Sequence, residues 1–332
     1  MSPRTIRWGI IGCGDVTEVK SGPAFQRAEH SALVAVMRRN RALARDYAAR
    51  HGVPRWYDDA DALIDDPDVD AVYVATPPST HKPYALRAAK AGKAVYVEKP
   101  MALDHAECLA MIDACRAAAV PLFVAHYRRA LPRFLKIKEL IDDRAIGDVR
   151  FVSITFYQRP SERDRQRDQL PWRVDPAIAG GGHFVDLAPH MLDFLDFALG
   201  PIAEVSGFAS NQGKLYAAED IVSAAFTFES GVQGVGTWCF TADDKRDHTE
   251  IVGSAGRITY STFDDQPIML TTPAGMTGFR IPNPPHIQQP LIQTIVDSLN
   301  GGGTCPSSGE DAARTSRVMD EMLAGAPWKR ND

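Results

Sequence analysis

The stretch Val95-Tyr96-Val97-Glu98-Lys99-Pro100 predicts both the centre of the fold and the position of a functional site. Its first three residues are apolar and β-prone, which is typical of a short buried strand. The run then ends abruptly in a carboxylate, an amine and a proline. In a parallel α/β sheet, ligands bind beyond the carboxyl ends of the strands. We therefore expect Lys99 to point into a pocket.

A second stretch, the glycines 180–182 followed by Asp186, His190 and Asp193, carries further polar side chains. Their spacing of four and then three residues places them on one face of a helix. A lysine, a histidine and an aspartate that converge on one pocket could move a proton to or from a substrate oxygen. Asp193 is explained equally well as an anchor of the helix. His183, in the same stretch, could reach the pocket or lie exposed in a loop.

The composition predicts a soluble globular protein of two domains, with 332 residues of which 45% are hydrophobic. A net charge of −5 argues against a surface for nucleic acid or an anionic membrane. No apolar run approaches the roughly 20 residues that span a bilayer, and the N-terminus lacks a signal-peptide core. The five cysteines are odd in number and lack CxxC spacing, so we expect a reduced, cytoplasmic protein.

Strand and helix patterns alternate through the first half of the chain. Apolar runs predict strands at residues 6–11, 32–37, 71–75, 94–97 and 122–125. Helical patterns fill the intervals and end near residues 27, 50, 65, 91 and 118. This alternation indicates βαβ units and a doubly wound parallel sheet of the Rossmann type. We assign residues 1–126 to this domain.

The second half changes to a period of two, seen in residues 152–156 and 222–228. Further strand candidates are residues 233–240, 249–252 and 257–260. We predict an α+β domain, residues 127–304, with a large open and mainly antiparallel sheet. An exposed apolar sheet face suits a subunit interface, so we expect a homodimer or homotetramer through this sheet.

The last part of the chain predicts two helices. Apolar residues with helical spacing cover residues 287–299, and Gly301 ends that helix. Ser307 and Glu310 form a candidate capping box for a final helix through about Leu323. We expect residues 305–332 to pack back on the first domain.

Gly12-Cys13-Gly14 lies between the first strand and the first helix, which is the context of the dinucleotide-binding fingerprint. The glycines let the backbone approach a pyrophosphate, and the helix N-terminus stabilises its charge. The third glycine is absent, because Thr17 stands in its place. We predict a cofactor site that includes Gly12, Cys13, Gly14, Asp15 and Val16.

The end of the second strand reads Met37-Arg38-Arg39-Asn40. Folds that bind NAD tend to place an acidic residue here, for the ribose hydroxyls. Two guanidinium groups instead suit the 2′-phosphate of NADP, which arginine can grip with two hydrogen bonds. We predict NADP in preference to NAD. The alternative is that Arg38 and Arg39 solvate a loop or face the adenine.

Together these motifs resemble the glucose–fructose oxidoreductase, inositol dehydrogenase and MocA family (Gfo/Idh/MocA). Four pieces carry the resemblance: residues 9–14 (GIIGCG), residues 75–81 (ATPPSTH), Glu98-Lys99-Pro100, and the glycines 180–182 with Asp186 and His190. The resemblance covers nearly the whole chain, including both sheet types in the family's order. The resemblance implies an NAD(P)-dependent oxidoreductase that transfers hydride between the nicotinamide and a hydroxyl or carbonyl carbon. By resemblance, the substrate is a sugar, a polyol or a related small molecule.

The resemblance also implies roles for single residues. Lys99 corresponds to the family's active-site lysine, Asp186 and His190 to its acid/base pair, and Pro100 to a proline whose preceding peptide bond is often cis. Further implied cofactor contacts come from Thr76, Pro77, Pro78, His81, Glu98, Lys99, Trp172 and Arg173. The implied substrate pocket is lined by Lys99, Tyr127, Arg128, Trp172, Asp186 and His190. The chain departs from the family at Ala188-Pro189, where a glycine is usual; Pro189 must begin a helix or kink it.

Two other functions are compatible with this fold. One is a glycosidase that uses bound nicotinamide for a transient oxidation followed by elimination. The other is a regulator that senses the dinucleotide without catalysis, which the presence of Lys99, Asp186 and His190 disfavours. A metal site made of His183, Asp186 and His190 is conceivable from residue types alone, but we predict no metal.

Overall fold

The structure is a computed structural model that describes residues 3–329, and the chain divides into two compact units. Unit 1 consists of Met1–Leu131 and Asn283–Ala313, and unit 2 of Pro132–Pro282 and Arg314–Asp332. These divisions differ from the boundaries expected from the sequence. Residues 283–304 belong to unit 1, and the final helix contributes its first residues to unit 1 and the remainder to unit 2.

Unit 1 contains a six-stranded sheet in the order β3-β2-β1-β4-β5-β6, which confirms the Rossmann-type prediction. Every neighbouring pair is parallel. The order reverses direction between β1 and β4, and such a switch point is where doubly wound sheets bind ligands. The strands are β1 (Ile6–Ile11), β2 (Ser31–Met37), β3 (Arg55–Tyr57), β4 (Ala71–Val74), β5 (Ala94–Val97) and β6 (Leu122–Val124).

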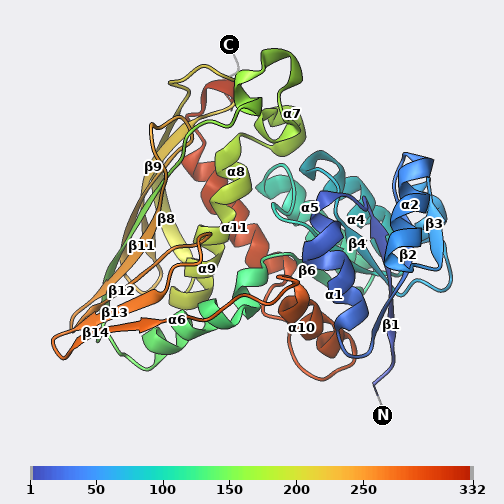
Figure 1. Cartoon of the computed structure of the whole chain (residues 1–332), viewed down its shortest axis with the longest axis horizontal. Helices are drawn as coiled ribbons and strands as arrows, with labels where there is room; N and C mark the ends of the chain where they lie inside the picture. Colours follow the sequence, from blue (N-terminus) through green and yellow to red (C-terminus); the bar gives the residue numbers. More distant parts are fainter. Residues whose placement is uncertain (1–2, 330–332) are drawn as a thin grey trace. The chain divides into compact units, whose positions relative to one another are not determined.

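Helices flank this sheet (Figure 1). The central strands β4 and β5 are buried along their whole length, which explains why they read as continuous apolar runs. Capping residues fix several helix ends: the Asn40 and Asp104 side chains accept N–H groups of the first turns, and Gly52 ends a helix with φ 64°. The helical segments are η1 (Thr17–Ser21), α1 (Gly22–Arg27), α2 (Arg41–His51), α3 (Ala60–Ile64), η2 (Pro78–Thr80), α4 (His81–Lys90), α5 (His105–Ala117), η3 (Tyr127–Ala130) and α10 (Gln289–Leu299).

The capping box predicted at Ser307 and Glu310 is wrong by one residue. The Asp311 backbone N–H donates to Ser308 Oγ at 3.2 Å, and the Ser308 N–H donates to the Asp311 carboxylate at 3.0 Å. The Ser307 side chain does not cap this helix. Its hydroxyl donates to the Val124 carbonyl oxygen at 2.7 Å and so attaches the chain to β6. The helix that follows is α11 (Gly309–Met322).

Unit 2 contains an eight-stranded sheet in the order β14-β13-β12-β11-β7-β10-β9-β8. All pairs are antiparallel except β7 with β10, so the prediction of a mainly antiparallel sheet is confirmed. The predicted alternation holds in β7, where Val152, Ile154 and Phe156 are buried. The strands are β7 (Val149–Tyr157), β8 (Ile202–Ser210), β9 (Ile221–Phe228), β10 (Gln233–Cys239), β11 (Arg246–Gly253), β12 (Arg257–Tyr260), β13 (Ile268–Thr272) and β14 (Gly275–Phe279).

The helices of unit 2 lie on one face of this sheet (Figure 1). Packing contacts attach these helices to the sheet: the Phe184 ring of a helix lies 5.2 Å from the Trp238 ring of β10. Gly207 makes room for the last helix, because a Cβ there would lie 2.9 Å from the Met322 Cα. The helical segments are α6 (Pro132–Asp142), η4 (Arg163–Arg165), η5 (Arg167–Gln169), η6 (Trp172–Val174), α7 (Pro176–Ala179), α8 (His183–Leu187), α9 (Pro189–Leu199), the larger part of α11, and η7 (Pro327–Lys329).

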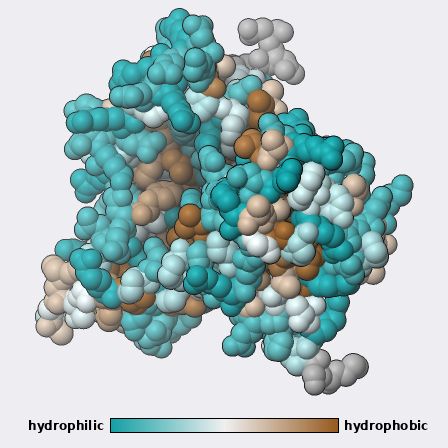
Figure 2. Space-filling view, turned by 45° about the vertical axis from the view of Figure 1, so that its right-hand side comes forward, coloured by the Kyte–Doolittle hydropathy of each residue, from teal (hydrophilic) through white to brown (hydrophobic). Residues whose placement is uncertain are grey.

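The surface in view in Figure 2 is mostly hydrophilic, with hydrophobic residues in small areas. Within residues 3–329, no helix has the length and apolar character needed to cross a membrane.

Candidate functional site

The glycine turn lies at the carboxyl end of β1, where Gly12 has a φ of 92°. A Cβ on Gly12 would lie 2.7 Å from Thr76 Cγ2 and 3.0 Å from the Ala75 carbonyl oxygen. Both the backbone angle and this close approach therefore require glycine. The N–H groups of Gly12 and Cys13 donate to the Met37 carbonyl oxygen at 2.9 and 3.1 Å, which attaches the turn to the end of β2.

The helix after the turn begins in an unusual way. Thr17, which replaces the third glycine, is buried and its hydroxyl donates to the Gly14 carbonyl oxygen at 2.8 Å. The Tyr47 hydroxyl donates in turn to the Thr17 carbonyl oxygen at 2.8 Å. The first turn, η1, is π-helical and leads into α1. Asp15 lies exposed ahead of it and Val16 is half-buried.

This turn fits a dinucleotide. A Cβ on Gly14 would meet only the Gly12 carbonyl oxygen, at 3.8 Å, so the backbone there is open to a close ligand. The Arg38 guanidinium lies beside it and donates to the Cys13 carbonyl oxygen at 3.4 Å, whereas Arg39 is exposed. The Cys13 thiol is buried, which raises its pKa to about 11, so it remains uncharged.

The loop after β4 is held from inside by His81, which is 1% exposed. One ring nitrogen lies 2.7 Å from the Thr76 carbonyl oxygen and the other 3.0 Å from the Pro100 carbonyl oxygen. Burial lowers the pKa of His81, which favours the neutral ring. His81 therefore supports the loop rather than presenting its ring to a ligand. Pro78 is buried at the start of η2, and Pro77 is half-buried.

The Glu98-Lys99-Pro100 turn follows β5, and its Lys99–Pro100 peptide bond is cis, as the resemblance implied. The Glu98 side chain points inward: its carboxylate accepts the Tyr73 hydroxyl and, at 2.6 Å, the Gln288 side-chain amide. Lys99 is half-buried. After β6, the buried residues Tyr127 and Arg128 lie together in η3, with the guanidinium carbon 5.1 Å from the tyrosine ring centroid.

In unit 2, the glycines 180–182 join α7 to α8. Gly180 ends α7 with a φ of 85°, and the Gly182 N–H donates to Glu219 Oε1 at 2.8 Å. The other Glu219 oxygen accepts the Trp328 indole N–H at 2.7 Å. Burial raises the pKa of Glu219. This carboxylate therefore fixes the turn that precedes the predicted acid/base residues.

Asp186 and His190 lie on two short helices rather than one. Ala188 is the N-cap of α9 and Pro189 its first residue, so the proline begins a helix as expected. Asp186 Oδ2 lies 3.3 Å from Arg173 Nε. His190 is 6% exposed, and its ring meets that of Phe263 edge-on at 5.6 Å.

Arg173, Asp193 and His183 each contact a neighbouring side chain in unit 2. The Arg173 guanidinium lies 4.5 Å from the ring centroid of Trp172, so the Trp-Arg pair and Asp186 lie together. Asp193 is buried and accepts the Thr315 hydroxyl at 3.4 Å, which supports its reading as a helix anchor. His183 is not an exposed loop residue: it lies in α8, and its ring nitrogen is 3.0 Å from the buried Asp164 carboxylate.

The predicted residues thus form two groups. The carboxyl edge of the parallel sheet in unit 1 carries the glycine turn, Arg38, the 76–81 loop and Lys99, and unit 2 carries Trp172, Arg173, Asp186 and His190. Within residues 3–329, no group of three histidine, cysteine, aspartate or glutamate side chains could hold a metal ion.

Sequence reasoning did not identify Tyr73, Glu219 or Gln288. A signal for Tyr73 was present, because β4 and β5 both read Ala-Val-Tyr-Val. A tyrosine in an otherwise apolar buried strand needs a hydrogen-bond partner for its hydroxyl. No comparable pattern marks Gln288, whose partners lie far away in the sequence.

Comparisons with known proteins agree with this arrangement. Residues 6–126 match the family described as oxidoreductase family, NAD-binding Rossmann fold, and residues 134–259 match the GFO/IDH/MocA C-terminal domain. The chain is 42% identical over 315 residues to "Oxidoreductase P35" of Formosa agariphila, covering 95% of this chain and 97% of that protein. It is 27% identical to "Myo-inositol 2-dehydrogenase" of Thermotoga maritima, over 92% of each chain.

Among solved structures, an aldose-aldose oxidoreductase from Caulobacter crescentus, complexed with glycerol, superposes with a TM-score of 0.86 at 27% identity. The match covers 98% of this chain and 99% of that one. Both domains of the family are present, in the order and over the length found in these relatives. The chain belongs to the GFO/IDH/MocA family of NAD-binding oxidoreductases.

Proposed function

We propose that this protein is an NADP-preferring dehydrogenase or reductase that interconverts a hydroxyl and a carbonyl group on a sugar, polyol or similar small molecule. The observation that carries the proposal is Lys99, at the carboxyl end of β5 in the same sheet whose β1 ends in the glycine turn. Relatives named for myo-inositol and for aldoses support the substrate class.

The cofactor would be held by the residues of unit 1. The open backbone of Gly12, Cys13 and Gly14 would receive the pyrophosphate, with Asp15 and Val16 at the start of the helix beyond it. Arg38, beside the turn, and the exposed Arg39 offer positive charge for a 2′-phosphate, which is why we infer NADP in preference to NAD. When bound, the nicotinamide supplies the hydride acceptor or donor.

Proton movement belongs to side chains of this chain. His190 would remove the substrate hydroxyl proton in oxidation, and a carboxylate such as Asp186 would stabilise the charged imidazole. The Lys99 ammonium would stabilise negative charge on the substrate oxygen. Arg173 forms an ion pair with Asp186, and it would set the orientation of this carboxylate.

The remaining predicted residues would shape the substrate pocket. In unit 1, Tyr127 and Arg128 offer an aromatic face and a guanidinium. In unit 2, Trp172 offers another aromatic ring, and each of these groups suits a hydroxylated ring or chain. His81 and Glu98 would contribute indirectly, because both side chains are turned inward and hold the loops around Thr76 and Lys99.

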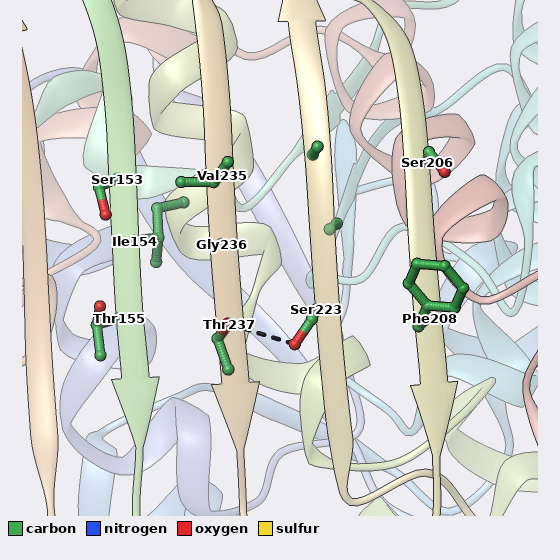
Figure 3. Close-up of a pocket in the computed structure, with 11 residues that line it drawn as sticks. Ser153, Ile154, Thr155, Ser206, Phe208, Ser223, Val235, Gly236 and Thr237 are labelled. Carbon is green, nitrogen blue, oxygen red and sulfur yellow. Dashed lines mark hydrogen bonds between the residues drawn. The ribbon is translucent and has the colours of Figure 1, made fainter.

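We further propose a homodimer or homotetramer through the open face of the unit 2 sheet. Figure 3 shows this face, with a pocket lined by β7, β10, β9 and β8. Small hydroxyl side chains alternate with two exposed apolar ones, Phe208 at 81% and Val235 at 52% exposed. The residues that line this pocket are all uncharged, and such a surface suits a second copy of the same sheet. None of the five cysteines, all within residues 3–329, forms a disulfide, which supports a cytoplasmic location.

A substrate screen tests the proposal. The protein would be mixed with NADP⁺ or NAD⁺ and with polyols, aldoses and dihydrodiols, and with the reduced cofactors and ketoses, while absorbance at the reduced-nicotinamide band is followed. We expect net oxidation or reduction with at least one hydroxylated substrate. Tight cofactor binding without turnover on any of them would contradict the proposal. The same screen includes glycosides, and release of an aglycone from one of them without net cofactor change would replace the proposal by glycosidase chemistry.

A further inference from the structure

A network of buried polar side chains contacts the Glu98-Lys99-Pro100 turn. Gln288 is 0% exposed, and it uses both ends of its side chain. Its amide nitrogen donates to Glu98 Oε1 at 2.6 Å, and its amide oxygen accepts the Tyr96 hydroxyl at 2.8 Å. The orientation of the amide is thereby determined, because a carboxylate accepts hydrogen bonds and a phenol donates one here.

The two tyrosines of the network occupy equivalent positions on neighbouring strands. Tyr73 and Tyr96 are register partners in β4 and β5, and their rings stack at 4.7 Å. The Tyr73 hydroxyl donates to the same Glu98 oxygen that Gln288 contacts. The second Glu98 oxygen accepts the Lys99 backbone N–H at 3.2 Å. A buried carboxylate at the end of β5 is therefore surrounded by donors from three segments.

Gln288 also reaches the cofactor side of unit 1. Its backbone N–H donates to the Lys20 carbonyl oxygen at 3.1 Å, in η1, the helical turn that follows the glycine turn. On the opposite side of the Lys99 turn, the His81 ring lies against the Pro100 carbonyl oxygen. The backbone on both sides of Lys99 is thus fixed by side-chain contacts: Gln288 binds the Glu98 carboxylate, and His81 contacts the Pro100 carbonyl oxygen.

We propose that Gln288 is a positioning residue of the oxidoreductase reaction: by holding the Glu98 carboxylate, it sets the place from which Lys99 acts. The inference rests on the proposed role of Lys99. Gln288 lies outside every motif of the sequence. It would not touch the substrate itself and would act on it through Lys99. Losing Gln288 would leave a buried carboxylate and a phenol short of a partner, and the turn would shift to find new ones.

The test compares Gln288→Met with Gln293→Met. Methionine keeps the length of the side chain and removes both hydrogen bonds. Gln293 lies in α10, the helix whose N-cap is Gln288, and its side chain bonds the Asp297 carboxylate and the Glu29 backbone, so it controls for general damage to α10. With the substrate found in the screen, we expect Gln288→Met to lower kcat roughly 10- to 100-fold. KM should stay within about twofold, and Gln293→Met should resemble wild type.

A second readout does not depend on turnover. Lysine amines would be methylated with ¹³C, and the Lys99 signal identified by its absence from Lys99→Met. We expect the Lys99 signal to move in Gln288→Met and to stay in place in Gln293→Met. If it moves while wild type turns over no substrate, the positioning stands and the proposed function fails. An unmoved signal, or a moved signal with unchanged kcat, overturns the inference.

Two further variants exclude a purely structural effect. If Gln288 acts through Lys99, the double variant Lys99→Met/Gln288→Met should be no slower than Lys99→Met alone, and multiplied effects would overturn the inference. Tyr96→Phe removes only the hydroxyl that contacts Gln288 and keeps the ring packing. Tyr96→Phe should shift the Lys99 signal in the same direction as Gln288→Met does, but by a smaller amount. If Gln288→Met fails to fold, Tyr96→Phe takes its place in the test.

Discussion

Single residues decide the chemistry of this protein, and several of them act from buried positions. His81 and Glu98 were predicted as cofactor contacts because of their place in motifs, yet both side chains turn inward and hold loops. Lys99, Arg38 and His190 are the residues whose side chains we expect to meet cofactor or substrate.

Replacing His190 by alanine should lower kcat by roughly 10²–10⁴, the range typical for loss of a general acid or base. The wild-type rate of alcohol oxidation should rise with pH as the imidazole loses its proton, and the variant should lose this rise. His30→Ala, at an exposed position, is the control. Steady-state kinetics across pH decide the matter, and an unchanged kcat in His190→Ala would remove His190 from the mechanism.

Replacing Arg38 by aspartate should weaken NADP(H) more than NAD(H). A charge-assisted contact with the 2′-phosphate would be lost, at a cost of about 1.5–3 kcal/mol of binding free energy. Arg45→Asp, on the exposed side of α2, makes the same change of charge away from the turn. Fluorescence titration of both cofactors measures the difference. Equal losses for NADP(H) and NAD(H) would place the phosphate elsewhere.

At the scale of secondary-structure elements, the cofactor turn depends on neighbours from several strands and helices. The turn after β1 fits against the loop after β4, and η1 is attached to α2 by a cluster of charged side chains. Glu18 in η1 meets the Arg50 guanidinium through two contacts of 2.8 Å and lies 2.7 Å from the His51 ring nitrogen. Both connections can be tested separately.

Gly12→Ala should weaken cofactor binding at least roughly tenfold, because the new methyl group would displace the loop at Thr76 and so disturb both sides of the site. Gly52→Ala is a matched control: Gly52 also has a positive φ, 64°, but a Cβ there meets nothing within 4 Å. Gly52→Ala should cost about 1 kcal/mol of stability and leave cofactor affinity unchanged. Cofactor titration and thermal unfolding of both variants separate backbone strain from the clash, and equal cofactor affinities would contradict the prediction.

The Glu18 cluster should make stability depend on acid. Hydrogen bonds from Arg50 lower the pKa of Glu18 to about 2, from an ordinary value of 4.5. A lowered carboxyl pKa stabilises the folded state above pH 4.5, and this contribution is lost as the pH falls toward 2. Because the side chain is a third exposed, we expect a contribution of about 1 kcal/mol or less.

Urea unfolding at pH 6 and pH 3 measures this effect. Glu18→Gln should lose less stability between the two pH values than wild type does. Glu29→Gln, which replaces an exposed glutamate of the same unit, should behave like wild type. Parallel losses in Glu18→Gln and wild type would show that the cluster contributes nothing to acid sensitivity.

At the scale of the whole molecule, the two units of the chain differ in how their sheets are covered. Unit 1 buries its parallel sheet under helices, whereas unit 2 covers only one face of its sheet (Figure 1). The uncovered face, seen in Figure 3, carries Ser and Thr side chains on neighbouring strands and Phe208 on β8. Phe208 lies on the edge strand β8 and is 81% exposed, and an apolar side chain so exposed on this face favours a partner surface.

Phe208→Asp should therefore convert the proposed homo-oligomer to monomer or weaken it strongly, because a buried unpaired carboxylate is costly at an interface. Leu109→Asp, at an exposed leucine of α5, introduces the same charge outside the sheet. Sedimentation velocity at micromolar concentration reports the assembly of both variants. A monomeric wild type would overturn the proposed interface, and so would an oligomer unchanged by Phe208→Asp.

The sequence by itself determined the parts of this protein that depend on local pattern. Alternating strand and helix signals predicted the doubly wound sheet, and period-two runs predicted most of the second sheet. β3, β8, β13 and β14 were missed, because they are short, partly exposed or rich in glycine and threonine, and so lack a strong periodic signal. The glycine turn, Lys99 and His190 can be proposed as site residues from the sequence alone, because their motifs are contiguous.

Only the tertiary structure decided what depends on contacts between distant segments. It assigned residues 283–304 to the first unit, moved the last capping box to Ser308, and turned Glu98 and His81 inward. It also brought Gln288 to Glu98 across 190 positions of sequence. The physical reason is that a buried polar group must find a partner wherever the chain supplies one. Local pattern shows that such a group exists, and only the packed fold shows which residue satisfies it.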